Sequence, residues 1–144
     1  MSKLKQSFDA GKFVVTSELN PPNGTDLSAL FEKAEALKDK IDGFNLTDSH
    51  SARMSVAPIA VAHLLLDRGV EPIMQMTARD RNRIALQSDM LAASLLGVDN
   101  LVFMGGDPPT VGDHPEAKPV FDLVSVPALK AARSLMNGTD MMGL

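Results

Sequence analysis

The chain has 144 residues, of which 44% are hydrophobic and 22% charged, as in ordinary globular domains. This length predicts one domain, and the composition argues against gross disorder. The net charge of -4, with no basic block, argues against a nucleic-acid partner, because phosphate binding needs clustered Lys and Arg. Cysteine is absent, which excludes disulfides and cysteine nucleophiles, and the three histidines are too scattered to suggest a metal site.

Targeting signals are not evident in the sequence. The N-terminus has no apolar core of signal-peptide length. The longest apolar stretch, Val56 to Leu66, is interrupted by Pro58 and His63 and is far shorter than the ~20 residues that span a bilayer. We therefore expect a cytoplasmic protein with no membrane partner.

Four strand-like segments alternate with four helix-like segments along the chain. The predicted strands are residues 13–19, 43–48, 72–77 and 100–106. The helix after the first strand has an apolar face from Leu27 to Leu37 and is capped by Thr25 or Asp26. The later helices are predicted near residues 58–68, 81–96 and 125–136, and Gly69 and Gly97 end the first two of these.

The strands begin near residues 13, 43, 71 and 100, so one strand and one helix repeat about every 30 residues. Strict alternation predicts a parallel sheet with right-handed crossovers, which fits both a doubly wound sheet and a TIM (βα)8 barrel. Pro21-Pro22 replaces the glycine-rich turn of a dinucleotide-binding fold, which favours the barrel. Because a barrel needs eight units and roughly 250 residues, we predict that residues 1–144 form about the first four βα units of one.

Polar residues end all four predicted strands. They are Glu18 on the first strand, Thr47 and Asp48 on the second, Gln75 and Thr77 on the third, and Gly105, Gly106 and Asp107 on the fourth. Reacting groups of parallel α/β folds lie at these carboxyl ends, so we expect one active-site mouth. Each residue also has a structural explanation, as a cap, a turn or a strand bend. For the glycine pair we favour close approach of a flat ligand to the backbone.

Glu18 is the residue for which a structural explanation is weakest. An acid within an apolar strand is seldom placed there for packing, because burying it without a partner costs several kcal/mol. Burial would favour its protonated form and suit it to a general-acid role. Arg79, Arg81 and Arg83, in contrast, alternate through a predicted helix start and are expected to face solvent.

Four motifs in the chain resemble those of one enzyme family. They are Ser17-Glu18-Leu19-Asn20-Pro21-Pro22, Asn45-Leu46-Thr47-Asp48, Gln75-Met76-Thr77-Ala78-Arg79-Asp80-Arg81-Asn82 and Gly105-Gly106-Asp107-Pro108-Pro109. In this order and spacing they resemble the methylenetetrahydrofolate reductase family over nearly the whole chain. The Arg-Asp-Arg-Asn run, the Leu86-Gln87-Ser88-Asp89 segment and Gly106-Asp107-Pro108-Pro109 are closest to the branch often fused to a homocysteine methyltransferase.

The resemblance implies a (βα)8 barrel that holds a non-covalent FAD, or FMN, at the carboxyl ends of its strands. NADH or NADPH reduces the flavin and leaves, and the folate substrate takes its place. The resemblance makes Glu18 the general acid, which protonates a ring nitrogen of methylenetetrahydrofolate. It makes Asp107 the charge that stabilises the resulting cation.

The flavin contacts that the resemblance implies are Thr47, Gln75, Met104, Gly105, Gly106 and Asp107. Two of them depart from the family pattern. Gln75 stands where histidine is usual, and it can form hydrogen bonds but carries no charge. Gly105 stands where some members have arginine, so one phosphate-directed cation is missing.

The leading hypothesis is therefore flavin-dependent reduction of 5,10-methylenetetrahydrofolate to 5-methyltetrahydrofolate with NAD(P)H, in one-carbon metabolism and methionine biosynthesis. The half barrel alone is expected to be inactive. The alternative is a non-catalytic folate- or flavin-binding subunit that completes its barrel with a partner chain. A flavin-free aldolase would need a lysine at a strand end, and none is present. Because half a barrel exposes two sheet edges, we expect an oligomer or a partner chain rather than a stable monomer.

Overall fold

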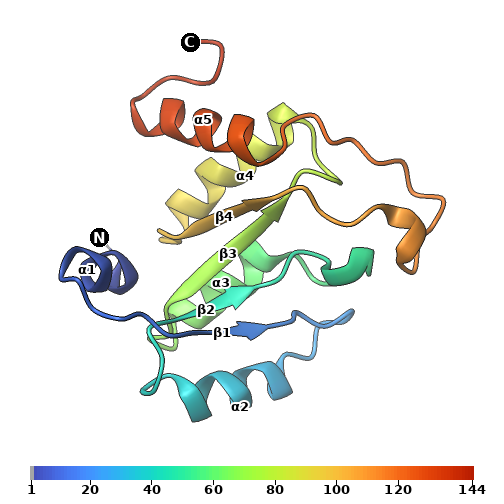
Figure 1. The fold of residues 1–144 in the computed structure, drawn as a ribbon. Coiled ribbons are helices and arrows are strands. Elements are labelled where there is room, and N and C mark those ends of the chain that lie inside the picture. The colour runs from blue at the N-terminus through green and yellow to red at the C-terminus, as the bar shows by residue number, and fades with distance from the viewer. Residues whose placement is uncertain (1) are drawn as a thin grey trace.

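A computed structural model, which describes residues 2–144, contains one parallel sheet of four strands. The strands are β1 (Thr16–Leu19), β2 (Gly43–Leu46), β3 (Pro72–Thr77) and β4 (Leu101–Met104). They are ordered β1-β2-β3-β4, and Figure 1 shows them all running in one direction. A doubly wound sheet reverses its strand order at a switch point, whereas this sheet follows the chain without reversal. The α/β fold is therefore consistent with part of a TIM barrel.

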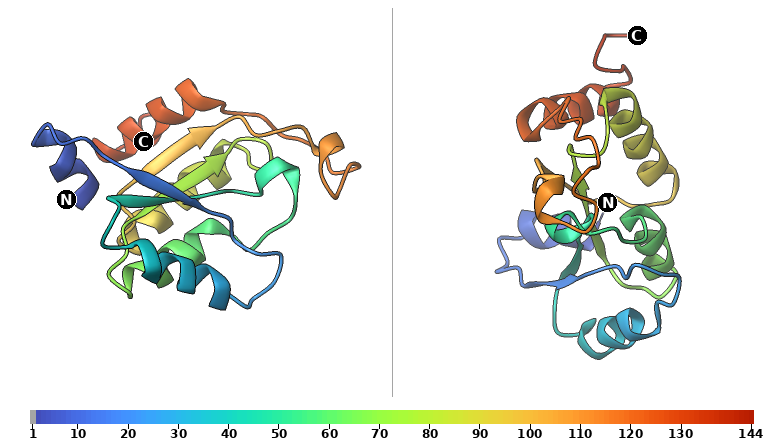
Figure 2. Two further views of the ribbon diagram at one scale, coloured as in Figure 1. Left: turned by 60° about the horizontal axis from the view of Figure 1, so that its bottom comes forward. Right: turned by 90° about the vertical axis from the view of Figure 1, so that its right-hand side faces the viewer.

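A helix follows each strand. These helices are α2 (Ser28–Leu37), α3 (Pro58–Leu66), α4 (Arg83–Leu95) and α5 (Ser125–Met136). They lie in an arc on one side of the sheet, as Figure 2 shows. Helix α3 packs on β2 and β3, and α5 packs on β4 and on α4. The strand-to-helix loops contain two short 3-10 helices, η1 (His50–Ala52) and η2 (Pro109–Val111).

A further helix, α1 (Lys3–Asp9), precedes the sheet and was not predicted. The Ser2 hydroxyl accepts a hydrogen bond from the Lys5 amide and caps this helix. The same hydroxyl bonds Asn100, just before β4, and the Leu4 amide bonds Glu71, just before β3. Helix α1 is thereby held at the amino-terminal ends of the strands, opposite the carboxyl ends where the site is expected.

The two faces of the sheet differ in composition. Partners in the strand register point to the same side, so the register assigns each side chain to one face. The face toward the helices supplies Leu19, Phe44, Leu46, Met74 and Met76 to the hydrophobic core. The opposite face, called the open face below, carries Thr16, Glu18, Asn45, Ile73, Gln75, Thr77, Val102 and Met104. The apolar face anchors the helices, and the open face is mostly polar.

The strand bounds differ from prediction at four ends, and the smallest difference is that β4 begins at Leu101 rather than Asn100. The first strand begins at Thr16 rather than Phe13, because its partner β2 begins only at Gly43. The unpaired Phe13 is 92% exposed. The second strand ends at Leu46, because the next two side chains turn into loop hydrogen bonds. The fourth ends at Met104, because Gly106 has a φ of +91°, which a strand cannot accommodate.

Candidate functional site

The predicted site residues all lie at the carboxyl end of the sheet. Glu18 is exposed and points to the open face, at the same register level as Asn45. Gln75 is half-buried on the same face beside Val102, and Met104 is paired with Thr77. The parallel order therefore gathers residues from all four strands at one rim, as the sequence predicted.

Glu18 and Asp107 stand on opposite sides of this rim. Glu18 belongs to β1 and Asp107 follows β4, and these are the outer strands of the sheet. Three strand spacings of about 4.8 Å each lie between β1 and β4, roughly 14 Å measured along the sheet. Both residues therefore lie at the same end of the sheet on opposite edges, and no hydrogen bond joins their carboxyl groups.

The expected burial of Glu18 is wrong for residues 2–144, since its side chain is exposed. Its carboxylate makes no ion pair or hydrogen bond with any other described residue; only its backbone carbonyl is used, by the Lys33 ammonium at 2.7 Å. Burial of Glu18 by residues 2–144 therefore gives no reason to expect it to act as a general acid. What the structure provides is an unpaired carboxylate on the open face.

Thr47 is buried, with 3% of its surface exposed. Its hydroxyl donates to the Asn20 side-chain oxygen at 2.9 Å, and its amide donates to the Leu19 carbonyl at 3.2 Å. Both contacts join the end of β2 to the end of β1. Thr47 thus has a structural role, and its hydroxyl proton is already committed to Asn20.

The two glycines after β4 differ in their surroundings. A Cβ at Gly106 would lie 3.1 Å from the Cβ of Arg79 and 3.2 Å from that of Thr77, and its φ of +91° favours glycine. Gly106 therefore has a structural reason to be glycine. A Cβ at Gly105 would meet nothing within 4 Å. Only Gly105 leaves uncovered space of the kind a flat ligand could use.

An ion-pair network joins the ends of β2 and β3. The Asp48 carboxylate is buried and accepts hydrogen bonds from the Thr77 amide at 2.8 Å and from Arg81 Nη1 at 2.6 Å. Arg81 also pairs with Asp89 of α4 at 2.8 Å. Burial by itself would lower the pKa of Arg81, but the hydrogen bonds and charges of Asp48 and Asp89 outweigh it and raise that pKa.

Arg79 is a buried charged residue of the rim, with 3% exposure. Its Nε and Nη2 donate to the two Asp80 oxygens at 2.8 and 2.6 Å, and its Nη1 donates to the Asp107 carbonyl at 3.3 Å. The hydrogen bonds that Arg79 donates to Asp80 raise the pKa of Arg79 against the effect of burial, and the charges of Asp80, Asp48 and Asp107 add to the rise. Three carboxylates thus act on one guanidinium.

The prediction that the three arginines face solvent is therefore wrong for Arg79 and Arg81. Residues 78–82 form a loop rather than the start of a helix, and α4 begins only at Arg83. Arg83 is about half exposed and pairs with Asp122 at 2.7 Å. The signal that could have identified the other two is their position in an Arg-Asp-Arg-Asn run directly after a strand end.

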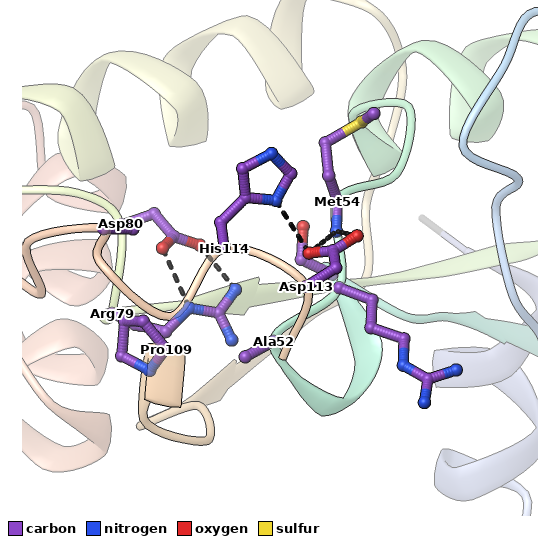
Figure 3. A pocket seen from close by; sticks show the side chains of 10 residues that line it. Ala52, Met54, Arg79, Asp80, Pro109, Asp113 and His114 are labelled. Atoms are coloured by element: carbon purple, nitrogen blue, oxygen red, sulfur yellow. Dashed lines mark hydrogen bonds and ion pairs between the residues drawn. The ribbon is translucent and has the colours of Figure 1, made fainter. Parts of the chain in front are cut away.

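A cavity of about 250 Å³ opens between the β2–α3 and β4–α5 loops. Figure 3 shows Arg79 with Asp80, and Asp113 with His114 and Met54, around it. Asp113 accepts the Met54 amide at 3.1 Å and pairs with His114 at 2.8 Å, and the bond from His114 lowers the pKa of Asp113. None of the predicted site residues lines this cavity. Its charged side chains are already bonded to one another, Arg53 excepted.

Within residues 2–144, the structure shows no candidate site for a metal ion and no candidate membrane span. No group of three or more His, Asp or Glu side chains is placed to hold a metal ion. No helix in the same range is long and apolar enough to cross a membrane.

Comparison with known proteins identifies the family of the chain. A sequence profile described as methylenetetrahydrofolate reductase matches residues 3–135. A search of curated proteins found no match. The matched range includes all four strands and the whole polar rim. On this match, and with the parallel sheet that the family resemblance implied, the chain belongs to the methylenetetrahydrofolate reductase family.

Proposed function

We propose that residues 1–144 are the N-terminal half of a (βα)8 barrel that reduces 5,10-methylenetetrahydrofolate to 5-methyltetrahydrofolate with NAD(P)H and a bound flavin. The family match supports a folate-related reductase. The observation that carries the proposal is the consecutive parallel strand order, which places Glu18, Gln75 and Met104 on one open face. In a closed barrel this face becomes the interior, so the remaining units would supply the burial that Glu18 lacks here.

The rim has groups that fit a flavin ring, as FAD or FMN. Gln75 is half-buried, and its side-chain amide forms no hydrogen bond with other residues of the range 2–144. This side-chain amide is therefore available to the polar edge of a ring. Val102 and Met104 are 37% and 42% exposed, and they offer an apolar surface beside it. A Cβ at Gly105 would meet nothing within 4 Å, so the space beside it is free for a ring. Gly106 and Asp107 follow it directly in the chain, and Thr47 follows the end of β2. A bound flavin would supply hydride transfer from NAD(P)H to the folate.

Glu18 is proposed as the general acid. Its unpaired carboxyl group would donate a proton to a ring nitrogen of the folate, so that the five-membered ring opens to an iminium cation. Asp107 is exposed at the opposite side of the rim, and its negative charge would stabilise that cation. The hydride that completes the reduction comes from NAD(P)H, which gives a balanced two-electron reaction.

A charge-neutralising variant tests the proposal in the chain combined with the remaining units of its barrel. Glu18→Gln should lower folate reduction by about 10²–10⁴-fold, because the proton donor is lost. It should leave NAD(P)H oxidation by a quinone unchanged, because that half reaction needs no proton from Glu18. Glu32→Gln, on the exposed surface of α2, is the matched control and should change neither rate.

Two outcomes would contradict the proposal. A wild-type protein that stays colourless and fails to take up added flavin would refute the oxidoreductase assignment. A protein that binds flavin and folate but neither oxidises NAD(P)H nor reduces the folate would favour the alternative, a non-catalytic binding subunit.

The proposal includes a partner for the sheet. Among residues 2–144, β1 and β4 each have a strand neighbour on one side only. We propose that their outer edges pair with the missing units, supplied by a partner chain or within an oligomer. Cytoplasmic location and a role in methionine biosynthesis remain part of the same proposal.

A further inference from the structure

The carboxylate of Asp48 holds the end of the neighbouring strand in place. Its Oδ2 atom accepts three hydrogen bonds, from the Thr77 amide at 2.8 Å, the Thr77 hydroxyl at 3.1 Å and Arg81 Nη1 at 2.6 Å. Thr77 is the last residue of β3. One buried oxygen therefore fixes both the backbone and the side chain at the carboxyl end of this strand.

Arg81 completes the arrangement from the other side. It donates to the Thr77 carbonyl at 3.3 Å and to Asp89 of α4 at 2.8 Å, in addition to Asp48. Both polar groups of the Thr77 backbone are thereby bonded to the Asp48–Arg81 pair. The pair acts on Thr77 as a clamp.

Thr77 in turn lies beside the end of β4, because it is paired with Met104 in the strand register. The backbone of Gly106, two residues later, runs close to it, since a Cβ added to Gly106 would lie 3.2 Å from the Thr77 Cβ and 3.4 Å from its Cγ2. A displacement of Thr77 would therefore shift the backbone of the Gly105–Asp107 turn, since close-packed atoms transmit small shifts. Gln75 lies two residues before Thr77 on the same face.

Stability alone is a weak reason for such a pair. A buried ion pair loses solvation that its attraction only partly restores, and apolar residues of similar volume often serve as well. We propose that Asp48 and Arg81 are positioning residues for the flavin: they fix Thr77, and through it Gln75 and the Gly105–Asp107 turn, in the geometry that binds the ring. This inference rests on the proposed function.

The test compares two double variants of the chain combined with the remaining units of its barrel. Asp48→Ala with Arg81→Met removes the hydrogen bonds to Thr77 without leaving an unpaired buried charge. Asp122→Ala with Arg83→Met is the control, because it removes an ion pair of 2.7 Å, against 2.6 Å for Arg81 and Asp48, at the start of α4 that does not touch Thr77. FAD affinity is measured by titration, exchange of the Thr77 amide by NMR, and stability by urea unfolding.

The clamp variant should bind FAD about tenfold more weakly, the equivalent of one lost hydrogen bond. Its Thr77 amide should exchange faster than the change in its unfolding free energy accounts for. The control should keep wild-type affinity, and its Thr77 exchange should change no more than its unfolding free energy does. Equal loss of affinity in both variants, or wild-type affinity in the clamp variant, would overturn the proposal. If the wild-type chain binds no FAD, the proposed function fails by itself, and unchanged Thr77 exchange in the clamp variant would then overturn the positioning role separately.

Discussion

The substitution Gly106→Ala tests how tightly the β4 turn is packed. The φ of +91° is costly for any residue with a Cβ, by about 1–2 kcal/mol. The new methyl group would also lie 3.1 Å from the Arg79 Cβ and 3.2 Å from the Thr77 Cβ, and overpacking of this kind adds about 1 kcal/mol. Reduced freedom of the unfolded chain returns roughly 0.4–1 kcal/mol. We expect a net destabilisation of about 2 kcal/mol.

Gly105→Ala is the matched comparison, one residue away. A Cβ there meets nothing within 4 Å and φ is not in the left-handed range, so we expect a gain of up to about 1 kcal/mol. Urea unfolding measures the change in unfolding free energy of both variants. In thermal unfolding, the Gly106 variant should melt roughly 6 °C below wild type. Equal stability of the two variants would refute the packing argument. If a ring lies against Gly105, this substitution should also weaken FAD binding in a protein that is folded as well as wild type.

The remaining predictions concern pH, assembly and the β1–β2 connection. The hydrogen bonds that Arg83 donates lower the pKa of Asp122 to about 2. The contribution of the ionised Asp122 to stability should therefore be complete above about pH 5 and lost as pH falls toward 2. Urea unfolding at several pH values checks this, and Asp122→Asn should flatten the dependence. The free sheet edges predict self-association, so light scattering should give a mass above 15.4 kDa, and a well-folded monomer would contradict the half-barrel proposal. Thr47→Val removes the bond to Asn20 and should destabilise the chain by about 1 kcal/mol, measured by thermal melting, and a change near zero would show that this bond contributes nothing.

Elements with strong local signals were predicted well. Strand β3 matches its predicted bounds, residues 72–77, because a run of large apolar residues begins there at a proline. Helix α5 also matches its predicted bounds, residues 125–136, because Asn137 and Gly138 directly after it mark its end. Helix α1 was missed because it buries only Leu4 and depends on contacts with Glu71 and Asn100, which lie far along the chain.

The rim of the site could be predicted, but its internal bonding could not. Parallel topology alone places Glu18, Gln75 and Asp107 at one end of the sheet. The burial of Arg79 and Arg81 depends instead on carboxylates that the fold brings to them. Asp48 lies 33 residues before Arg81, and no periodicity relates the two positions. The exposure of Glu18 escaped prediction for a similar reason, because it depends on what covers the open face.

The consecutive strand order bears on how the chain folds. Paired residues in neighbouring strands are only 27 or 28 positions apart, as Thr16 with Gly43, Phe44 with Pro72 and Met74 with Leu101 show. No pairing has to wait for a distant part of the sequence, so loop-closure entropy is small and similar at every step. A nascent chain leaving the ribosome could therefore add one unit after another, each using the strand laid down just before it as a template.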